Sequence, residues 1–178
     1  MSAAPSSRPP HQPHLGDLIG AERDIVAKLA TVDLAVDYDA LAVVSNIFRV
    51  AAMARRRIEQ DALAPERLSW TAFTTLWVLW IWGEMEARHL AAEANVSKGT
   101  LTGVLDTLEG RGLVARRRRT SDRRLVMVAL TDAGAEVIAR VFPNVNATEV
   151  EVAGHLSSRQ RRAMAAGLRA MVRGLAEH

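Results

Sequence analysis

The spacing of apolar residues along the chain predicts a mainly helical protein. Helical repeats span residues 15–29 and 38–61, and the second repeat breaks over 62–68, which contains a proline. A third helix is expected over 71–81, with the hydroxyl of Ser69 as its N-terminal cap. This third helix is itself apolar on nearly every side, so we expect it to pack between other layers.

The middle of the chain is predicted to hold two short helices joined by a tight turn. The first helix spans 86–94, the turn falls at 95–96, and Ser97 caps a second helix that ends near Arg111. One face of this second helix is apolar at intervals of three and four residues, through Leu101, Val104, Leu105 and Leu108. The other face carries Ser97, Lys98, Thr100, Thr102, Gly103 and Asp106. Because these side chains are short or polar, and because Gly103 costs a helix about 1 kcal/mol relative to alanine, this face is predicted to meet a partner.

After Gly112 the spacing of apolar residues changes from the helical period to every second residue, which is typical of a strand. Strands are expected over 113–117 and 125–130, and the link 118–124 between them is a basic hairpin. A helix, a turn, a second helix and an arginine-tipped hairpin, in that order, form a winged helix-turn-helix. The predicted fold class is therefore mainly α with a small β-hairpin wing.

Two further helices are predicted at the C-terminal end. Thr131 caps the first, which Pro143 is expected to kink or interrupt, and Ser157 with Gln160 forms a capping box for the second, ending near Gly174. The apolar side of the last helix consists of Met164, Leu168, Met171, Val172 and Leu175. The domain boundaries that we expect are a disordered tail over 1–14, N-terminal helices over 15–68, the winged helix-turn-helix over 69–134 and C-terminal helices over 135–178.

Composition excludes several classes of protein. The 178 residues are 49% hydrophobic and 24% charged, which is typical of a globular protein rather than a fibrous or disordered one. No segment reaches the roughly 18 uninterrupted apolar residues of a membrane helix, and the Pro- and Ser-rich start lacks the apolar core of a signal peptide. A cytoplasmic protein that does not bind membranes is expected. The absence of cysteine excludes disulfides and thiolate chemistry.

Positive charge is concentrated in one short region. The net charge is only +3, but residues 96–124 hold eight Lys and Arg against three Asp and Glu, a local excess of five. Seven of these eight cations are arginine, whose planar guanidinium suits phosphate oxygens and base edges. The charge alone also fits a solvated loop, because arginine makes up 21 of the 23 basic residues of the chain.

The predicted elements match the grooves of duplex DNA. The major groove admits one α-helix and displays a distinct donor and acceptor pattern for each base pair, so the polar face of the second helix is placed to contact bases. The hairpin can reach the adjacent minor groove, where arginine is the side chain that inserts. The remaining arginines would neutralise phosphates.

An ordered series of motifs over residues 76–134 resembles the MarR (multiple antibiotic resistance regulator) family. The motifs are Leu90-Ala91, Ser97-Lys98-Gly99-Thr100-Leu101-Thr102, Leu108-Glu109, Arg111-Gly112-Leu113-Val114, Asp122-Arg123-Arg124 and Leu130-Thr131-Asp132-Ala133-Gly134. The resemblance implies an obligate homodimer in which helices over 38–61 and 135–175 interlock. The run of four arginines over 116–119 and the helix over 15–29 depart from the usual pattern.

The resemblance also implies roles for individual residues. Lys98, Thr100 and Thr102, with Gly103, would lie in the major groove, and Ser97 would lie at a phosphate. Arg124 would enter the minor groove, oriented by Asp122. The complete set of predicted wing residues is Arg117, Arg118, Arg119, Asp122, Arg123 and Arg124.

Members of the family commonly bind small aromatic acids between the dimer helices and the DNA-binding lobe. From their positions on the two helices expected to face that crevice, we expect its walls to be formed by Phe48, Arg49, Met53, Trp77 and Trp80. For the tryptophans, simple core packing is the alternative interpretation.

The expected function is that of a sequence-specific transcriptional regulator, specifically a repressor of pseudo-palindromic operators that a small aromatic or phenolic ligand releases. Its two recognition helices would lie about 34 Å apart on double-stranded DNA. The alternative is an architectural DNA-binding protein that responds to no ligand. An enzyme is not expected, since the five histidines are scattered and no nucleophile and base recur at a useful spacing; neither a cofactor nor a metal is expected.

Overall fold

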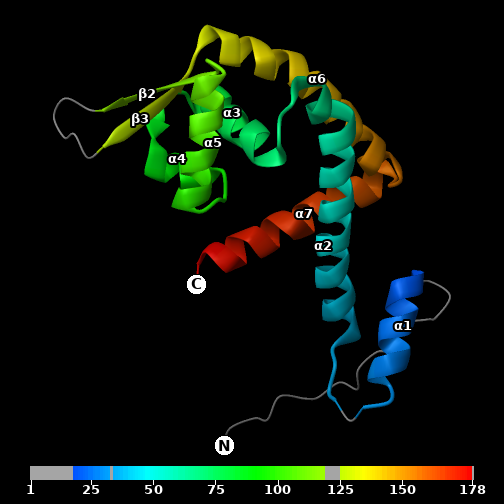
Figure 1. Cartoon of the computed structure of the whole chain (residues 1–178). Coiled ribbons are helices and arrows are strands. Elements are labelled where there is room, and N and C mark those ends of the chain that lie inside the picture. The colour runs from blue at the N-terminus through cyan, green and yellow to red at the C-terminus, as the bar shows by residue number, and fades with distance from the viewer. Residues whose placement is uncertain (1–17, 33, 119–124, 178) are drawn as a thin grey trace, which may run out of the picture. The chain divides into compact units, whose positions relative to one another are not determined.

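A computed structural model describes residues 18–32, 34–118 and 125–177. These residues fall into two compact units, one ending at Met53 and the other beginning at Ala54. The predicted tail over 1–14 lies outside the described residues. Figure 1 follows the chain through both units.

The N-terminal unit contains the helix α1 (Gly20–Leu29) and most of the helix α2 (Tyr38–Ile58). Within the described part of the expected helix over 15–29, helical structure begins only at Gly20, where Glu22 accepts a hydrogen bond from the backbone of Ile19 at 3.1 Å. The other carboxylate oxygen of Glu22 accepts a hydrogen bond from the Asn46 side chain at 2.6 Å. This buried carboxylate therefore ties α1 to α2.

The end of α2 differs from the prediction. The α-helix stops at Ile58 rather than near residue 61 and continues as a π-helical turn, η1 (Glu59–Leu63), and a 3₁₀ turn, η2 (Ala64–Glu66). The predicted break at 62 is wrong, because Ala62 and Leu63 are still helical and are buried in the core. Burial of these two residues compensates for the poorer hydrogen bonding of the wide turn.

Helix α3 (Trp70–Trp82) is the centre of the second unit. The hydroxyl of Ser69 accepts a hydrogen bond from the backbone of Ala72 at 3.2 Å, which confirms the predicted cap. Leu76 and Leu79 are buried, but Trp80 and Trp82 at the end of the helix are 41% and 59% exposed. Burial on all sides is therefore wrong for the last turn, although it holds for much of the helix.

A short sheet and two helices follow α3. The elements in order are β1 (Met85–Glu86), α4 (Ala87–Glu93), α5 (Lys98–Gly110), β2 (Val114–Arg118) and β3 (Val126–Leu130). The strands are antiparallel in the order β1-β3-β2, and Arg116 pairs with the buried Val128. Both long strands lie within a residue of their predicted bounds, whereas the two-residue β1 was not predicted because it is too short to show a period.

Helix α6 (Asp132–Gly154) starts directly after the sheet. Thr131 caps it as predicted, accepting a hydrogen bond from the backbone of Gly134 at 3.1 Å. Of the two outcomes predicted at Pro143, a kink or an interruption, the interruption is wrong, because the helix runs through this residue; Figure 1 shows a helix that bends along its length. Val141 and Val145, on either side of the proline, are buried, and their packing offsets the lost backbone hydrogen bond.

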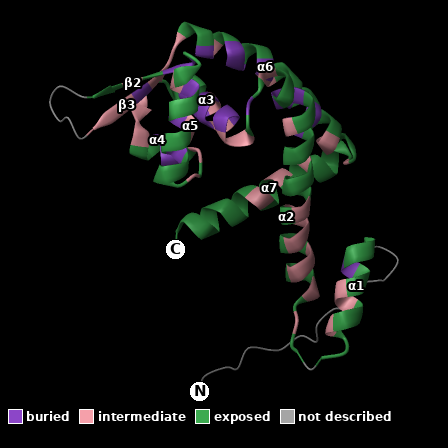
Figure 2. Cartoon of the chain, viewed as in Figure 1, coloured by how far each residue is buried: buried purple, intermediate pink, exposed green. Residues whose placement is uncertain are grey.

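The last helix, α7 (Ser158–Ala176), begins at the predicted capping box of Ser157 and Gln160. None of its described residues is buried, and Figure 2 shows it almost entirely exposed, in contrast to α3 and α6. Val172 and Leu175, from its predicted apolar side, are 67% and 77% exposed.

Candidate nucleic-acid interface

Helix α5 presents a polar face because its other face is anchored in the core. Leu101, Leu105 and Leu108 are buried, as their spacing predicts, and Val104 is half-buried. The Ser97 hydroxyl accepts a hydrogen bond from the backbone of Thr100 at 3.0 Å and fixes the start of the helix. All the predicted major-groove residues are exposed, namely Ser97, Lys98, Thr100, Thr102 and Gly103.

The exposed face of α5 carries short side chains, and hydroxyl protons on it are already donated within the helix. Thr102 donates its hydroxyl proton to the carbonyl of Lys98 at 2.9 Å, which leaves its oxygen lone pairs and its methyl group to face a partner. A Cβ atom added at Gly103 would meet nothing within 4 Å, so packing within the chain gives no reason for glycine there. The geometry thus permits close approach of another surface to the α5 backbone.

The strand β2 sends successive arginines to opposite sides. Arg117 forms an ion pair with Glu84, and its guanidinium holds the pKa of that carboxyl below the usual value through a side-chain hydrogen bond. Arg118 is exposed at the end of the strand. The other predicted wing residues, Arg119, Asp122, Arg123 and Arg124, lie outside the described residues.

Arg116 points the other way, toward α5. Its guanidinium donates to the carboxylate of Glu109 at 2.9 Å and lies 2.8 Å from that of Asp106. The side-chain hydrogen bond from Arg116 lowers the pKa of Glu109, and the backbone hydrogen bond of Arg116 lowers it further. The run of four arginines over 116–119 gives no sign of this separate role for Arg116, although the alternation of side chains along a strand distinguishes it from Arg117.

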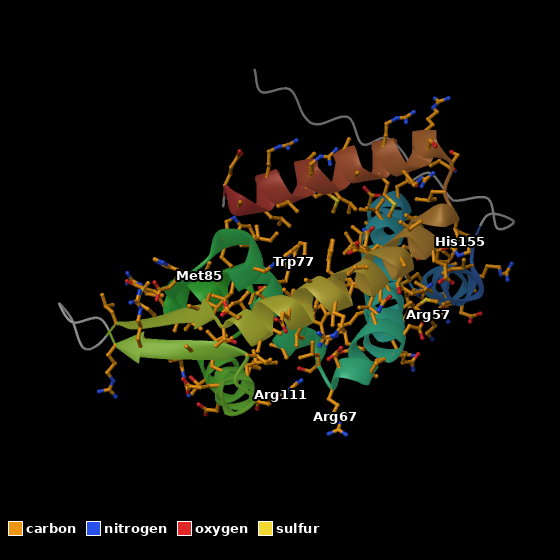
Figure 3. All side chains as sticks on the ribbon, turned by 90° about the horizontal axis from the view of Figure 1, so that it is seen from above. Arg57, Arg67, Trp77, Met85, Arg111 and His155 are labelled. Carbon is orange, nitrogen blue, oxygen red and sulfur yellow. The ribbon has the colours of Figure 1, made fainter. Side chains whose placement is uncertain are left out.

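A second arginine in the basic region is also used within the fold. Arg111, at the end of α5, donates hydrogen bonds to the carbonyl oxygens of Arg67 at 3.0 Å and Glu66 at 2.9 Å. Figure 3 shows Arg67 and Arg111 on the same edge of the unit. Arg140 from α6 donates to the Glu66 carboxylate at 2.9 Å and lowers its pKa. The turn before α3 is thus held by arginines from two other helices.

The predicted ligand residues lie in both compact units. In α2, Phe48 and Met53 are 72% and 64% exposed, and Nη1 of Arg49 is buried without a hydrogen-bond partner among the described residues. In the second unit, Trp77 stacks on Phe142 of α6 with ring centroids 4.5 Å apart, and Trp80 lies 5.5 Å from Trp77. Core packing thus accounts for much of Trp77, while Trp80 retains an exposed surface.

Neither a membrane-spanning helix nor a metal site is found in the described ranges. Over residues 18–32, 34–118 and 125–177, no helix is both long and apolar enough to cross a membrane. The same ranges contain no group of three His, Asp or Glu side chains arranged to hold a metal ion.

Comparisons with known proteins agree with this geometry. The MarR family pattern matches residues 68–126, from the turn before α3 to the start of β3. The chain is 34% identical to the uncharacterized HTH-type transcriptional regulator YwaE of Bacillus subtilis, over 79% of this chain and 83% of the relative. It is 28% identical to the HTH-type transcriptional repressor NicR of Pseudomonas putida, over 76% and 85%.

A solved structure with the same fold is that of BpsR from Bordetella bronchiseptica, whose DNA binding is regulated by 6-hydroxynicotinic acid. The TM-score is 0.66 with 26% identity, and the match covers 72% of this chain and 98% of BpsR. The fold and the exposed α5 face define a winged helix-turn-helix DNA-binding protein. The chain belongs to the MarR family of transcriptional regulators, a family that is not enzymatic.

Proposed function

We propose that the protein is a homodimeric repressor that binds pseudo-palindromic DNA and is released by a small aromatic acid. The observation that carries the proposal is the exposed face of α5, where Ser97, Lys98, Thr100, Thr102 and Gly103 lie together on a helix anchored by buried leucines. A helix with this face suits the major groove, and the wing beside it suits the adjacent minor groove.

The apolar surfaces of the chain support a dimer. Val172 and Leu175 of α7 are highly exposed, as are Phe48 and Met53 of α2. Exposed apolar side chains gathered on helices are typical of an interface that another chain covers. A twofold dimer would present two copies of α5 about 34 Å apart, which matches the two halves of a pseudo-palindrome.

The proposed ligand follows from the chemistry of two groups of side chains. Trp77 and Trp80 offer aromatic faces for a ring, and Nη1 of Arg49, which is buried and has no hydrogen-bond partner among the described residues, is a donor for a carboxylate. Phe48 and Met53 would add apolar contacts. BpsR, which shares the fold, is regulated by an aromatic acid, and this likeness adds support.

Competition footprinting tests the DNA-binding part of the proposal. We expect two protected half-sites about one helical turn apart on DNA taken from the genomic neighbourhood of the gene. If each subunit neutralises about four phosphates, the logarithm of affinity falls against the logarithm of salt concentration with a slope near −7. Uniform coverage without preferred sites would instead indicate the architectural alternative.

The ligand part is tested by thermal shift with a panel of aromatic carboxylates. A ligand that binds only the folded state raises the apparent stability by mass action. We expect Arg49→Gln to abolish the shift, whereas the matched variant Arg162→Gln, on the exposed α7, retains it. Equal shifts in both variants would remove Arg49 from the ligand site.

A further inference from the structure

Three side chains join the recognition helix α5 to the wing, the hairpin formed by β2 and β3. The Arg116 cluster, as we name it, consists of Asp106 and Glu109 from α5 and Arg116 from β2. Nε of Arg116 lies 2.9 Å from Oε2 of Glu109, and Nη2 lies 2.8 Å from Oδ1 of Asp106. The backbone N–H of Arg116 also donates to Oε1 of Glu109, at 3.1 Å. Glu109 therefore binds both the main chain and the side chain of one wing residue.

The position of Arg116 in the sheet explains how this contact fixes the wing relative to α5. β2 is an edge strand of the sheet, so its outer N–H groups have no partner strand. The carboxylate of Glu109 accepts one of these N–H groups, while Val128 pairs with Arg116 on the inner side. The start of the wing is thus held between the sheet and α5.

The contribution of the Arg116 cluster to the stability of the fold is too small to explain why these residues are present. The Asp106 side chain is 60% exposed and the Glu109 side chain is 39% exposed, and exposed ion pairs contribute little to folding. On a surface that approaches DNA, two carboxylates also repel phosphates. A role in orientation explains why acids occupy this position, because the guanidinium fork of Arg116 can meet both carboxylates in only a narrow range of directions.

We propose that Glu109 and Asp106 are positioning residues for DNA recognition, which act through Arg116 by holding the wing at a fixed angle to the recognition helix. Arg116 itself then serves the fold rather than the DNA, and contact with the minor groove falls to the predicted wing residues beyond Arg117, which is paired with Glu84. This inference rests on the proposed function.

The two explanations predict affinity changes of opposite sign when a negative charge is removed. Removal of a negative charge near DNA strengthens binding if only electrostatics acts, and weakens specific binding if the charge positions the wing. Glu109→Gln is the test variant, and Glu93→Gln is the matched control, because it removes one exposed negative charge from α4 in the same lobe. Affinity is measured for a duplex that the wild-type protein selects from a random pool and for a scrambled duplex.

We expect Glu109→Gln to lower affinity for the selected duplex by about tenfold and to leave affinity for the scrambled duplex unchanged or higher. The salt dependence for the selected duplex becomes less steep, although no cation was removed, because wing contacts to phosphate are lost. Glu93→Gln leaves both affinities unchanged or slightly higher. Arg116→Met also lowers affinity for the selected duplex, and Glu109→Gln causes a smaller further loss in that background than in the wild type, since the two changes break a shared linkage.

An equal or higher affinity of Glu109→Gln for the selected duplex overturns the proposal. If that variant does not fold, as judged by circular dichroism, Asp106→Asn, which removes only the outer carboxylate charge, takes its place with the same expected direction. If the wild-type protein selects no duplex at all, the proposed function fails, which is a different outcome from a failure of the positioning role.

Discussion

Substitution of Gly134 by alanine is expected to destabilise the protein strongly, because two backbone segments meet at this residue. A Cβ atom at Gly134 would lie 2.0 Å from the carbonyl oxygen of Leu113 and 3.0 Å from Cδ2 of Leu130. The first distance is far below van der Waals contact, and a backbone oxygen cannot turn aside as a flexible side chain can. The start of α6 must therefore move away from the start of β2.

The cost can be worked out from the contacts that this movement disturbs. Overpacking costs about 1–3 kcal/mol. Thr131 donates hydrogen bonds to the carbonyl oxygens of Leu113 and Gly112, at 3.2 Å and 2.6 Å, and each contributes about 1 kcal/mol. Alanine regains about 1 kcal/mol of helix propensity. We expect a net loss of about 2–4 kcal/mol in the free energy of unfolding.

Urea denaturation followed by circular dichroism measures this loss. Gly154→Ala is the matched control, since Gly154 is also helical and an added Cβ would meet nothing within 4 Å. The control is expected to be as stable as the wild type or slightly more stable. A Gly134→Ala variant with wild-type stability would refute the inferred close contact.

Three further expectations follow from the site. Ser97→Asp keeps the N-cap of α5 and so leaves the urea midpoint almost unchanged, but it places a negative charge at the predicted phosphate contact and abolishes DNA binding in a gel-shift assay; retained binding would contradict that contact. Arg111→Met removes two hydrogen bonds to exposed carbonyl groups and is expected to lower the free energy of unfolding by about 1 kcal/mol, and an unchanged urea midpoint would show that this link contributes nothing. The pKa values of Glu66, Glu84 and Glu109 are lowered in the folded state, so the unfolded state binds more protons as the pH falls through the ordinary glutamate value of 4.5. Stability from these groups is therefore complete above that pH and lost below it, and acid titration of Glu109→Gln should show a weaker loss than the wild type.

The sequence predicted the elements whose signals are local. The caps at Ser69, Ser97, Thr131 and Ser157 could be predicted because a hydroxyl just before a helical apolar pattern accepts a hydrogen bond from the first turn of the helix. The buried face of α5 and the two long strands followed from their periods. Family resemblance then indicated the function of the exposed face, which periodicity alone could not supply.

The features that sequence reasoning missed depend on contacts between distant residues. The π-helical turn at the end of α2 forms because tertiary burial of Leu63 overrides a local break, and α6 continues through Pro143 for the same reason. The basic region over 96–124 appeared to be a single DNA-binding surface, yet Arg111 and Arg116 are bound to Glu66 and Glu109 within the fold. No count of charges could separate structural arginines from those predicted to contact DNA.

The most direct test of the central claim compares the DNA sequences that the wild-type protein and Thr102→Ala select from a random pool. If the exposed face of α5 contacts bases, the wild type selects a pseudo-palindrome, and Thr102→Ala changes the preferred base at one position in each half-site. Selection of an identical motif by both proteins would remove Thr102 from base recognition, and the absence of any motif would contradict sequence-specific binding altogether.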